Sequence, residues 1–320
     1  MELGFDSLSP SMKIFSGRAN NPLASEIASC LGTTLGKIQL YNFSDGELRV
    51  AFEENIRNED VFIIQSTNPP SSNVLELLFM LDAARRASAN RVIAVVPYFG
   101  YARQDRKDEP RVPISARVLL DLMNVVGINR IMAMDLHSPQ IQGFINTPFD
   151  HLYSSMALFD RLKEFDLNFD SGVVLAPDVG SAKISQSYAK RLGVGFALID
   201  KRRPKPNEAK VAHIVGELKD KHVIIIDDMI DTAGTICNAA ETAMNKGASS
   251  VTAVGTHPVL SGESISRLSD SPINKVIVCN TIDIPENKKF DKLEIISVAH
   301  VFAEAMKHVT DGTSLSSMFT

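Results

Sequence analysis

Residues 222–235, HVIIIDDMIDTAGT, decide the fold. Four consecutive β-branched residues at 223–226 predict a strand that is buried on both faces, because neither face of such a strand meets water. Two adjacent acids follow, and a helix is expected to begin near Ala233. A strand that leads through a short turn into a helix is the repeating unit of a parallel α/β sheet.

The turn in this stretch suits a phosphate, because it presents backbone N–H groups and the positive end of a helix dipole. Carboxylates beside it suit a ribose diol or a hydrated Mg²⁺ ion. Ordinary helix capping explains one Asp at such a corner. It does not explain a whole cluster of polar and small residues at one tip, namely Asp227, Asp228, Asp231, Thr232, Gly234 and Thr235.

Working outward from this stretch, short β-branched runs alternate with amphipathic segments along most of the chain. We expect strands at 12–16, 61–65, 92–97, 131–135, 173–177, 195–200, 223–227, 251–256 and 275–279, and helices at 73–89, 115–126, 181–192, 233–246 and 300–310. These are too many strands for one sheet. We therefore predict two α/β domains, residues 10–150 and 151–305, each with a mainly parallel sheet flanked by helices.

The polar segment 146–153, NTPFDHLY, interrupts the pattern and is the expected boundary between the domains. The last expected helix is free to pack on either domain. Ligands of such sheets bind at the carboxyl ends of strands, so residues that directly follow strands are the informative ones.

Composition restricts the class of protein. The chain has 320 residues, 44% hydrophobic and 22% charged, with a formal net charge of −5, which argues against general nucleic-acid binding. Its three cysteines, Cys30, Cys237 and Cys279, lack metal-site spacing and favour a reduced, cytoplasmic chain. No signal peptide and no membrane-spanning run are expected.

Two motifs in the first half resemble nucleotide-contacting segments. In YNFSDGE, residues 41–47, the ring of Phe43 suits a base, whereas Asp45 and Glu47 suit an amine or a ribose. Taken alone, this motif is better explained by a polar turn with a packed Phe. PYFGYARQDR, residues 97–106, follows a strand and ends in clustered cations. It fits a phosphate clamp on a closing loop, or an ordinary solvated loop.

Three further motifs follow expected strands. MDLHSPQIQG at 134–143 places Asp135 and His137 where a His could hold Mg²⁺ or bind phosphate. APDVGS at 176–181 offers Asp178 as a helix cap or a metal-linked carboxylate. IDKRRPKP at 199–206 gathers four cations at a strand end, Lys201, Arg202, Arg203 and Lys205, and suits charge stabilisation in phosphoryl transfer.

Two other glycine-containing segments carry no function. GTTLGK at 32–37 has one residue too few for a P-loop, and GVGFAL at 193–198 lacks the third glycine of a dinucleotide fingerprint.

Taken together, the motifs resemble those of class I ribose-phosphate diphosphokinases, from about Lys13 to Phe319. The resemblance implies two tandem phosphoribosyltransferase-like domains. It also implies transfer of the diphosphoryl group of Mg-ATP to the anomeric hydroxyl of ribose 5-phosphate, giving phosphoribosyl diphosphate and AMP for nucleotide biosynthesis.

Site roles are implied in the same way. ATP would be bound by Phe43, Asp45, Gly46, Glu47, Arg103, Gln104, Asp105 and His137. Ribose 5-phosphate would be bound by Arg203, Asp227, Asp228, Asp231, Thr232, Ala233, Gly234 and Thr235. Catalysis would rest on Lys201 and Arg203, and Mg²⁺ would be held by His137 and Asp178.

The family also implies a homohexamer built of dimers, with phosphate as activator and ADP as inhibitor. The candidate allosteric residues are Arg57, Arg86, Ser314, Ser316 and Phe319. The chain departs from the family pattern in PDVGSAKIS, where Ser181 replaces a glycine and Ile184 stands where Arg is common.

Two alternatives remain on the sequence alone. The chain could be a non-catalytic regulatory homologue, which would be expected to lose YARQDRK or DKRRP, yet both motifs are intact. It could also be a phosphoribosyltransferase, which would have no reason to keep the first-half motifs.

Overall fold

The computed structural model describes residues 11–202 and 211–319. Contacts divide the chain into two compact units: Met1–Tyr153 with Ala299–Thr320, and Ser154–Val298. The C-terminal helix therefore belongs with the first unit, whereas the sequence-based division placed residues up to 305 in the second domain.

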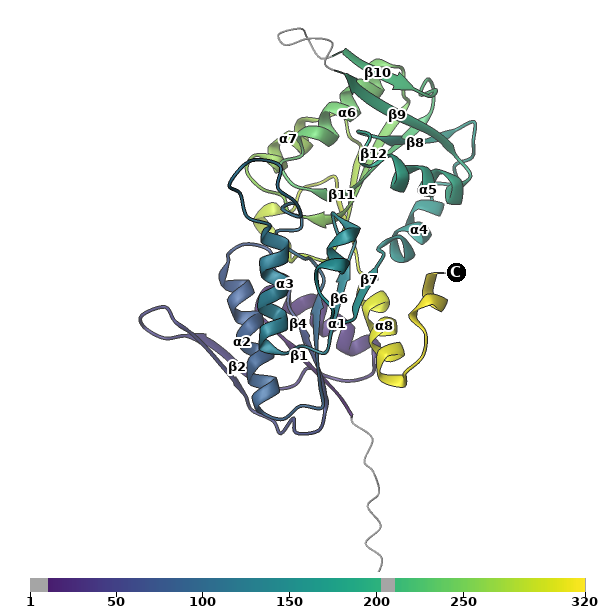
Figure 1. The fold of residues 1–320 in the computed structure, drawn as a ribbon. Helices are drawn as coiled ribbons and strands as arrows, with labels where there is room; N and C mark the ends of the chain where they lie inside the picture. The colour runs from purple at the N-terminus through teal and green to yellow at the C-terminus, as the bar shows by residue number, and fades with distance from the viewer. Residues whose placement is uncertain (1–10, 203–210, 320) are drawn as a thin grey trace, which may run out of the picture. The chain divides into compact units, whose positions relative to one another are not determined.

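The first unit is built on a five-stranded parallel sheet, in the order β1-β4-β5-β6-β7 (Figure 1). Its strands are β1 (Met12–Ser16), β4 (Asp60–Ile64), β5 (Arg91–Val96), β6 (Arg130–Met134) and β7 (Phe149–Leu152). Its helices are α1 (Asn21–Cys30), α2 (Ser72–Arg86), α3 (Ser115–Val126) and α8 (Ala299–Asp311), with short 3₁₀ turns η1 (Pro139–Phe144) and η3 (Leu315–Phe319).

The core of this unit explains the helix positions. The apolar stripe of α2 (Leu77, Leu78, Leu81) joins that of α3 and alternate strand residues in one buried cluster. α1 and α8 contact each other, so the end of the chain packs beside its beginning. A hairpin of β2 (Ile38–Asn42) and β3 (Leu48–Phe52) extends away from the sheet (Figure 1).

The first division between the two units falls after Tyr153, at the end of the segment expected to be the boundary. The expectation that this segment interrupts the strand pattern was wrong, because it contains a strand. Residues 149–152 form β7, which pairs with β6 in parallel. Its polar side chains have specific partners: Arg130 forms an ion pair with Asp150 at 2.7 Å, and the Leu136 N–H donates to His151 at 2.9 Å. Because these partners are remote in sequence, hydropathy alone gave no sign of the strand.

The second unit is built on a seven-stranded sheet, β10-β9-β8-β11-β12-β13-β14, in which only β10 is antiparallel. The strands are β8 (Gly172–Ala176), β9 (Gly195–Arg202), β10 (Val211–Val215), β11 (His222–Ile230), β12 (Ser250–Pro258), β13 (Lys275–Cys279) and β14 (Leu293–Ile296). The helices are α4 (Ser155–Lys163), α5 (Ala182–Leu192), α6 (Gly234–Asn245) and α7 (Ser264–Asp270), with a 3₁₀ turn η2 (Glu286–Lys288).

The strand order reverses direction at β8, since β9 lies on one side of it and β11 on the other. Such a switch point opens a crevice at the carboxyl ends of the two strands, where α/β proteins bind ligands. The α/β fold with helix-flanked parallel sheets that the sequence predicted is thus confirmed.

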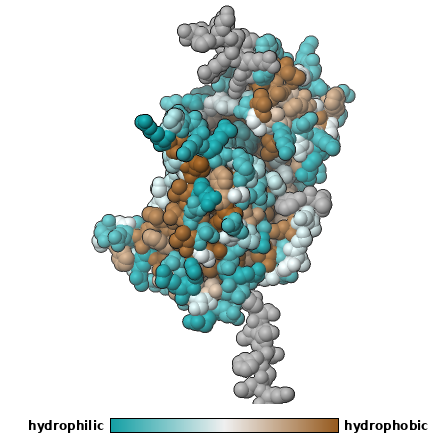
Figure 2. All heavy atoms as spheres, viewed as in Figure 1, coloured by the Kyte–Doolittle hydropathy of each residue, from teal (hydrophilic) through white to brown (hydrophobic). Residues whose placement is uncertain are grey.

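One face of the first unit is unusually apolar. Figure 2 shows hydrophobic atoms gathered over α2 and α3. The exposed apolar side chains there are Leu75 and Phe79 of α2, and Val118, Leu122 and Val125 of α3. Among the residues that the structure describes, we find no helix long and apolar enough to cross a membrane.

Candidate active site

The carboxyl end of β11 is open toward β8. Pairing between the two strands stops at Ile225, whereas β11 stays paired with β12 as far as Ile230. Asp227 and Asp228 therefore belong to the strand, which extends beyond the expected end at residue 227. Asp227 and Asp228 thus lie beyond the part of β11 that pairs with β8, at the carboxyl end of the sheet.

Asp227 lies in an electrostatically unfavourable place for a carboxylate. Burial, together with the charges of Asp228 and Asp178, raises its pKa to about 8. The Asp228 N–H partly offsets this by donating to Asp227 Oδ1 at 3.0 Å. The negative charges of two further acids at neighbouring strand ends thus act on Asp227 and disfavour its ionised form.

Asp178 is held by the start of α5. The backbone N–H of Ser181 donates to Asp178 Oδ1 at 3.0 Å, and the Ser181 hydroxyl donates to Asp178 O at 3.1 Å. Ser181 has φ −86°, a conformation that needs no glycine. The departure from the family pattern is therefore compatible with an ordered Asp178 loop.

The turn between β11 and α6, which we call the phosphate loop (residues 231–235), has the features that the sequence predicted. The side chains of Thr232 and Thr235 are exposed, and α6 begins at Gly234. Ala233 has φ +62°, a left-handed conformation that is uncommon for a residue with a side chain. This loop ends at the positive pole of a helix, where anions bind well.

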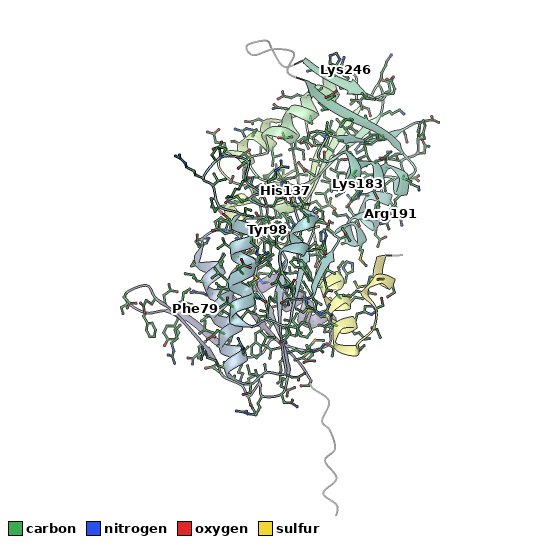
Figure 3. The ribbon with its side chains drawn as sticks, in the orientation of Figure 1. Phe79, Tyr98, His137, Lys183, Arg191 and Lys246 are labelled. Atoms are coloured by element: carbon green, nitrogen blue, oxygen red, sulfur yellow. The ribbon has the colours of Figure 1, made fainter. Side chains whose placement is uncertain are left out.

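In the first unit, the loop after β5 is anchored at its start. Tyr98 and Phe99 are buried, and the Tyr98 carbonyl accepts from the Thr67 N–H at 2.9 Å. The Gly100 N–H donates to Thr67 Oγ1 at 2.7 Å. Tyr98 and His137, which follow neighbouring strands, lie at the same end of the unit (Figure 3).

Farther along, this loop and the loop after β6 enclose a cavity of about 200 Å³. Two guanidinium groups line it opposite an exposed imidazole. The lining residues are Arg103, Asp105, Arg106, Asp108, His137, Ser138 and Gln140. The structure thus brings together three of the residues expected at the ATP site, Arg103, Asp105 and His137.

Asp105 joins the two loops. Its Oδ2 accepts from Ser138 Oγ at 2.6 Å and from Gln140 Nε2 at 2.8 Å. Burial opposes ionisation, but these bonds prevail and hold the pKa of Asp105 below its usual range. Neighbouring Gln104 accepts from the Ser115 hydroxyl at the start of α3. Ser138 and Gln140 belong to the motif at 134–143, but their role was not predicted, because their partner Asp105 lies in another loop.

The remaining nucleotide candidates lie at the tip of the β2–β3 hairpin and do not line that cavity. Gly46 adopts φ +93° in the turn, and Asp45 Oδ1 accepts from the Glu47 N–H at 3.0 Å. The ring of Phe43 is 46% exposed and packs edge-on against Tyr41. Asp45 has the structural role of a turn residue, while Phe43 presents a free aromatic face.

Of the two catalytic candidates, the structure describes only the backbone of Lys201. The backbone of Lys201 lies in β9 opposite Ala212 of β10, and Arg203 lies outside the described residues. Of the allosteric candidates, Arg57 is exposed after β3, and Arg86 pairs with Asp82 at 2.6 Å at the end of α2. Ser314 and Ser316 follow α8, and the side chain of Phe319 lies outside the description.

The described part of the chain holds no group of three or more His, Cys, Asp or Glu side chains arranged for a metal ion. A dedicated protein cage is therefore absent from residues 11–202 and 211–319. Mg²⁺, which keeps several waters and takes one or two carboxylates plus phosphate oxygens, does not need such a cage.

Comparison with known proteins is consistent with both halves of this description. Residues 12–127 match the model of the N-terminal domain of ribose phosphate pyrophosphokinase, and residues 202–320 match the phosphoribosyl synthetase-associated domain. The chain is 50% identical to a ribose-phosphate pyrophosphokinase of Chlorobaculum tepidum over 96% of this chain and 95% of the relative.

Other relatives give the same picture. A ribose-phosphate pyrophosphokinase of Caldanaerobacter subterraneus is 48% identical over 97% of this chain and 98% of its own. The crystal structure of phosphoribosylpyrophosphate synthetase from Mycobacterium smegmatis superposes with a TM-score of 0.88 at 37% identity, covering 94% of this chain and 99% of that one.

Proposed function

The chain belongs to the ribose-phosphate pyrophosphokinase family, and on this basis we propose how its own residues carry out the reaction. The enzyme transfers the diphosphoryl group of ATP to ribose 5-phosphate, forming phosphoribosyl diphosphate and AMP. The expected family is confirmed, and a regulatory or phosphoribosyltransferase role is not favoured.

We propose that ribose 5-phosphate binds at the carboxyl end of β11, where pairing with β8 has ended. Asp227 and Asp228 accept hydrogen bonds from the ribose hydroxyls. The phosphate loop receives the 5-phosphate through its N–H groups, the Thr232 and Thr235 hydroxyls and the start of α6. This arrangement fixes the sugar at both ends, so that its anomeric oxygen is oriented for attack.

The cavity between the two first-unit loops carries the proposal for ATP. Arg103 and His137 face the phosphates, while Gln104 and Asp105 hold the loop in shape through Ser115, Ser138 and Gln140. Phe43, Asp45, Gly46 and Glu47 are proposed to contact the adenine of a neighbouring subunit, because their hairpin tip is exposed.

In the reaction, the anomeric oxygen attacks the β-phosphorus and loses its proton, and the bond from that phosphorus to the AMP oxygen breaks. Lys201 and Arg203, the latter also near ribose 5-phosphate, are proposed to neutralise the charge that develops on the transferred group. Such preorganised cations are the main catalytic device of phosphoryl transfer.

His137 and Asp178 are proposed to hold Mg²⁺. The acidic surroundings of Asp178 support this proposal, because burial and the charges of Asp228 and Asp178 raise the pKa of Asp227 to about 8, and a cation held by Asp178 would relieve that repulsion. When bound, the ion supplies charge neutralisation for the phosphates.

The assembly and regulation are proposed as well. The apolar face on α2 and α3 supports a homo-oligomer, a hexamer built of dimers in the family pattern. Phosphate and ADP are proposed as regulators acting through Arg57, Arg86, Ser314, Ser316 and Phe319. Three free cysteines support a reducing, cytoplasmic setting.

The function is tested by incubating the protein with ATP and Mg²⁺, with and without ribose 5-phosphate, and measuring AMP. We expect AMP only when the sugar is present, and activity lost on chelation and restored by Mg²⁺. AMP that forms equally without the sugar would indicate a different reaction.

A further inference from the structure

The segment after β12 lies against the phosphate loop. We call residues 260–267 the brace; they include the start of α7. Three successive carbonyl groups before α6 accept hydrogen bonds from the brace. In order, Leu260 N–H donates to Ile230 O at 2.9 Å, Ser261 N–H to Asp231 O at 3.1 Å, and Arg267 Nη1 to Thr232 O at 2.6 Å.

These bonds determine where the N–H groups of the loop point. In a trans peptide the C=O of one residue and the N–H of the next are coplanar and point in opposite directions. With three carbonyls turned toward the brace, the N–H groups of Asp231, Thr232 and Ala233 point away from it. Successive N–H groups on one side form a concave anion-binding surface.

The last of these peptides is the one that most needs support. Ala233 has φ +62°, and such a residue keeps its conformation only where the surroundings restrain it. Arg267 binds the peptide that directly precedes Ala233. The Ser261 hydroxyl also donates to the carboxylate of Asp231, so the brace holds both backbone and side chain of the loop.

We infer that Arg267 is a positioning residue for the sugar phosphate: by holding the Thr232 carbonyl, it turns the Ala233 N–H toward the 5-phosphate. This inference rests on the proposed use of the loop for ribose 5-phosphate. Arg267 acts through geometry rather than through bare charge. Its side chain is 42% exposed and lies 3.7 Å from the carboxylate of Glu263, which partly neutralises it.

The test is steady-state kinetics of the full-length enzyme with Arg267→Ala. The KM for ribose 5-phosphate should rise about tenfold or more, as expected for losing a hydrogen bond from a charged donor. The KM for ATP should stay within about twofold, because the bond of Arg267 to the Thr232 carbonyl supports the sugar loop. Arg267→Lys, which keeps one charged donor, should recover part of the loss.

Glu263→Ala is the matched control, since it removes the ion pair of Arg267 and leaves the bond to Thr232. It should leave both KM values unchanged. An unchanged KM for the sugar in Arg267→Ala, an equal rise for both substrates, or an equal effect of Glu263→Ala would overturn the inference. If Arg267→Ala does not fold, Arg267→Met, which keeps an apolar side chain of similar length but has no donor, is measured instead, and the same outcomes decide.

The experiments distinguish failure of the positioning role from failure of the proposed function. Failure of the unmodified enzyme to release AMP would reject the function itself. Normal activity with an unaffected Arg267→Ala variant would reject only the positioning role.

Discussion

The carboxyl group of Asp227 is held in its neutral form near neutral pH by burial and by two acidic neighbours. Its pKa of about 8 in the folded chain exceeds the ordinary value of 3.8, so the folded state keeps a proton that the unfolded chain releases. The contribution of this group to the free energy of unfolding is fully present below the ordinary pKa of 3.8, and it is lost as pH rises through the folded pKa.

Asp227→Asn should remove that dependence. Without divalent cations, we expect the Tm of the variant to exceed that of the unmodified protein increasingly between about pH 4 and pH 8. Differential scanning calorimetry at several pH values measures this. Asp170→Asn, at an exposed turn, serves as control and should give a difference that does not change with pH.

Lys201 is the residue on which we propose that catalysis depends most. Lys201→Ala should lower kcat about a hundredfold or more, because a preorganised cation is lost where charge develops. Folding should be little changed, since the backbone of β9 remains paired with β10. Lys246→Ala, at the exposed end of α6 (Figure 3), is the control and should keep full activity. Activity of Lys201→Ala close to normal would reject the assigned role.

Single residues also show what could be predicted from sequence. Asp227, Asp228 and the phosphate loop were foreseen because strand, acids and helix start are contiguous. Ser261 and Arg267 were not, because they meet the loop only after the chain has returned through β12. A partner about 30 residues away, on another element, leaves no local pattern.

At the scale of elements, buried parallel strands were the easiest to predict, since they are continuous β-branched runs such as residues 223–226. The strand β7 and the β2–β3 hairpin escaped prediction because their strands are short and only partly buried. Their positions depend on partners in other elements, such as Arg130 for Asp150.

The loop after β5 depends on the close approach of Gly100 to Thr67. A Cβ added to Gly100 would overlap the Thr67 carbonyl oxygen, and backbone cannot move aside cheaply. Gly100→Ala should therefore destabilise the protein by about 1–3 kcal/mol and raise the KM for ATP more than that for ribose 5-phosphate. Thermal unfolding and kinetics measure both effects.

Gly143→Ala is the matched control for that variant, because nothing lies within 4 Å of the added Cβ. It should leave Tm and both KM values close to normal. Equal behaviour of the two variants would show that the Gly100–Thr67 contact does not shape the loop.

In the whole molecule, α2 and α3 expose an apolar face that no part of the same chain covers among the described residues. Val125 is 74% exposed, so Val125→Glu should hardly affect folding. We expect it to lower the molar mass measured by light scattering, because a buried charge in a subunit contact is costly. Phe169→Glu, on an exposed apolar residue of the second unit, should leave the mass unchanged.

An unchanged molar mass for Val125→Glu would place the subunit contact elsewhere. The sequence indicated oligomerisation only through family resemblance, because exposure of an apolar helix face depends on how the sheet and both helices pack.

We propose that a ribose 5-phosphate bound at the end of β11 receives a whole diphosphoryl group from ATP. The most direct measurement follows phosphorus from ATP labelled separately at the α and γ positions. We predict that the α label appears only in AMP and that the γ label appears in the sugar product, in equal amounts. Formation of ADP with a label on a sugar monophosphoryl group, or release of the γ label as free phosphate, would contradict the account.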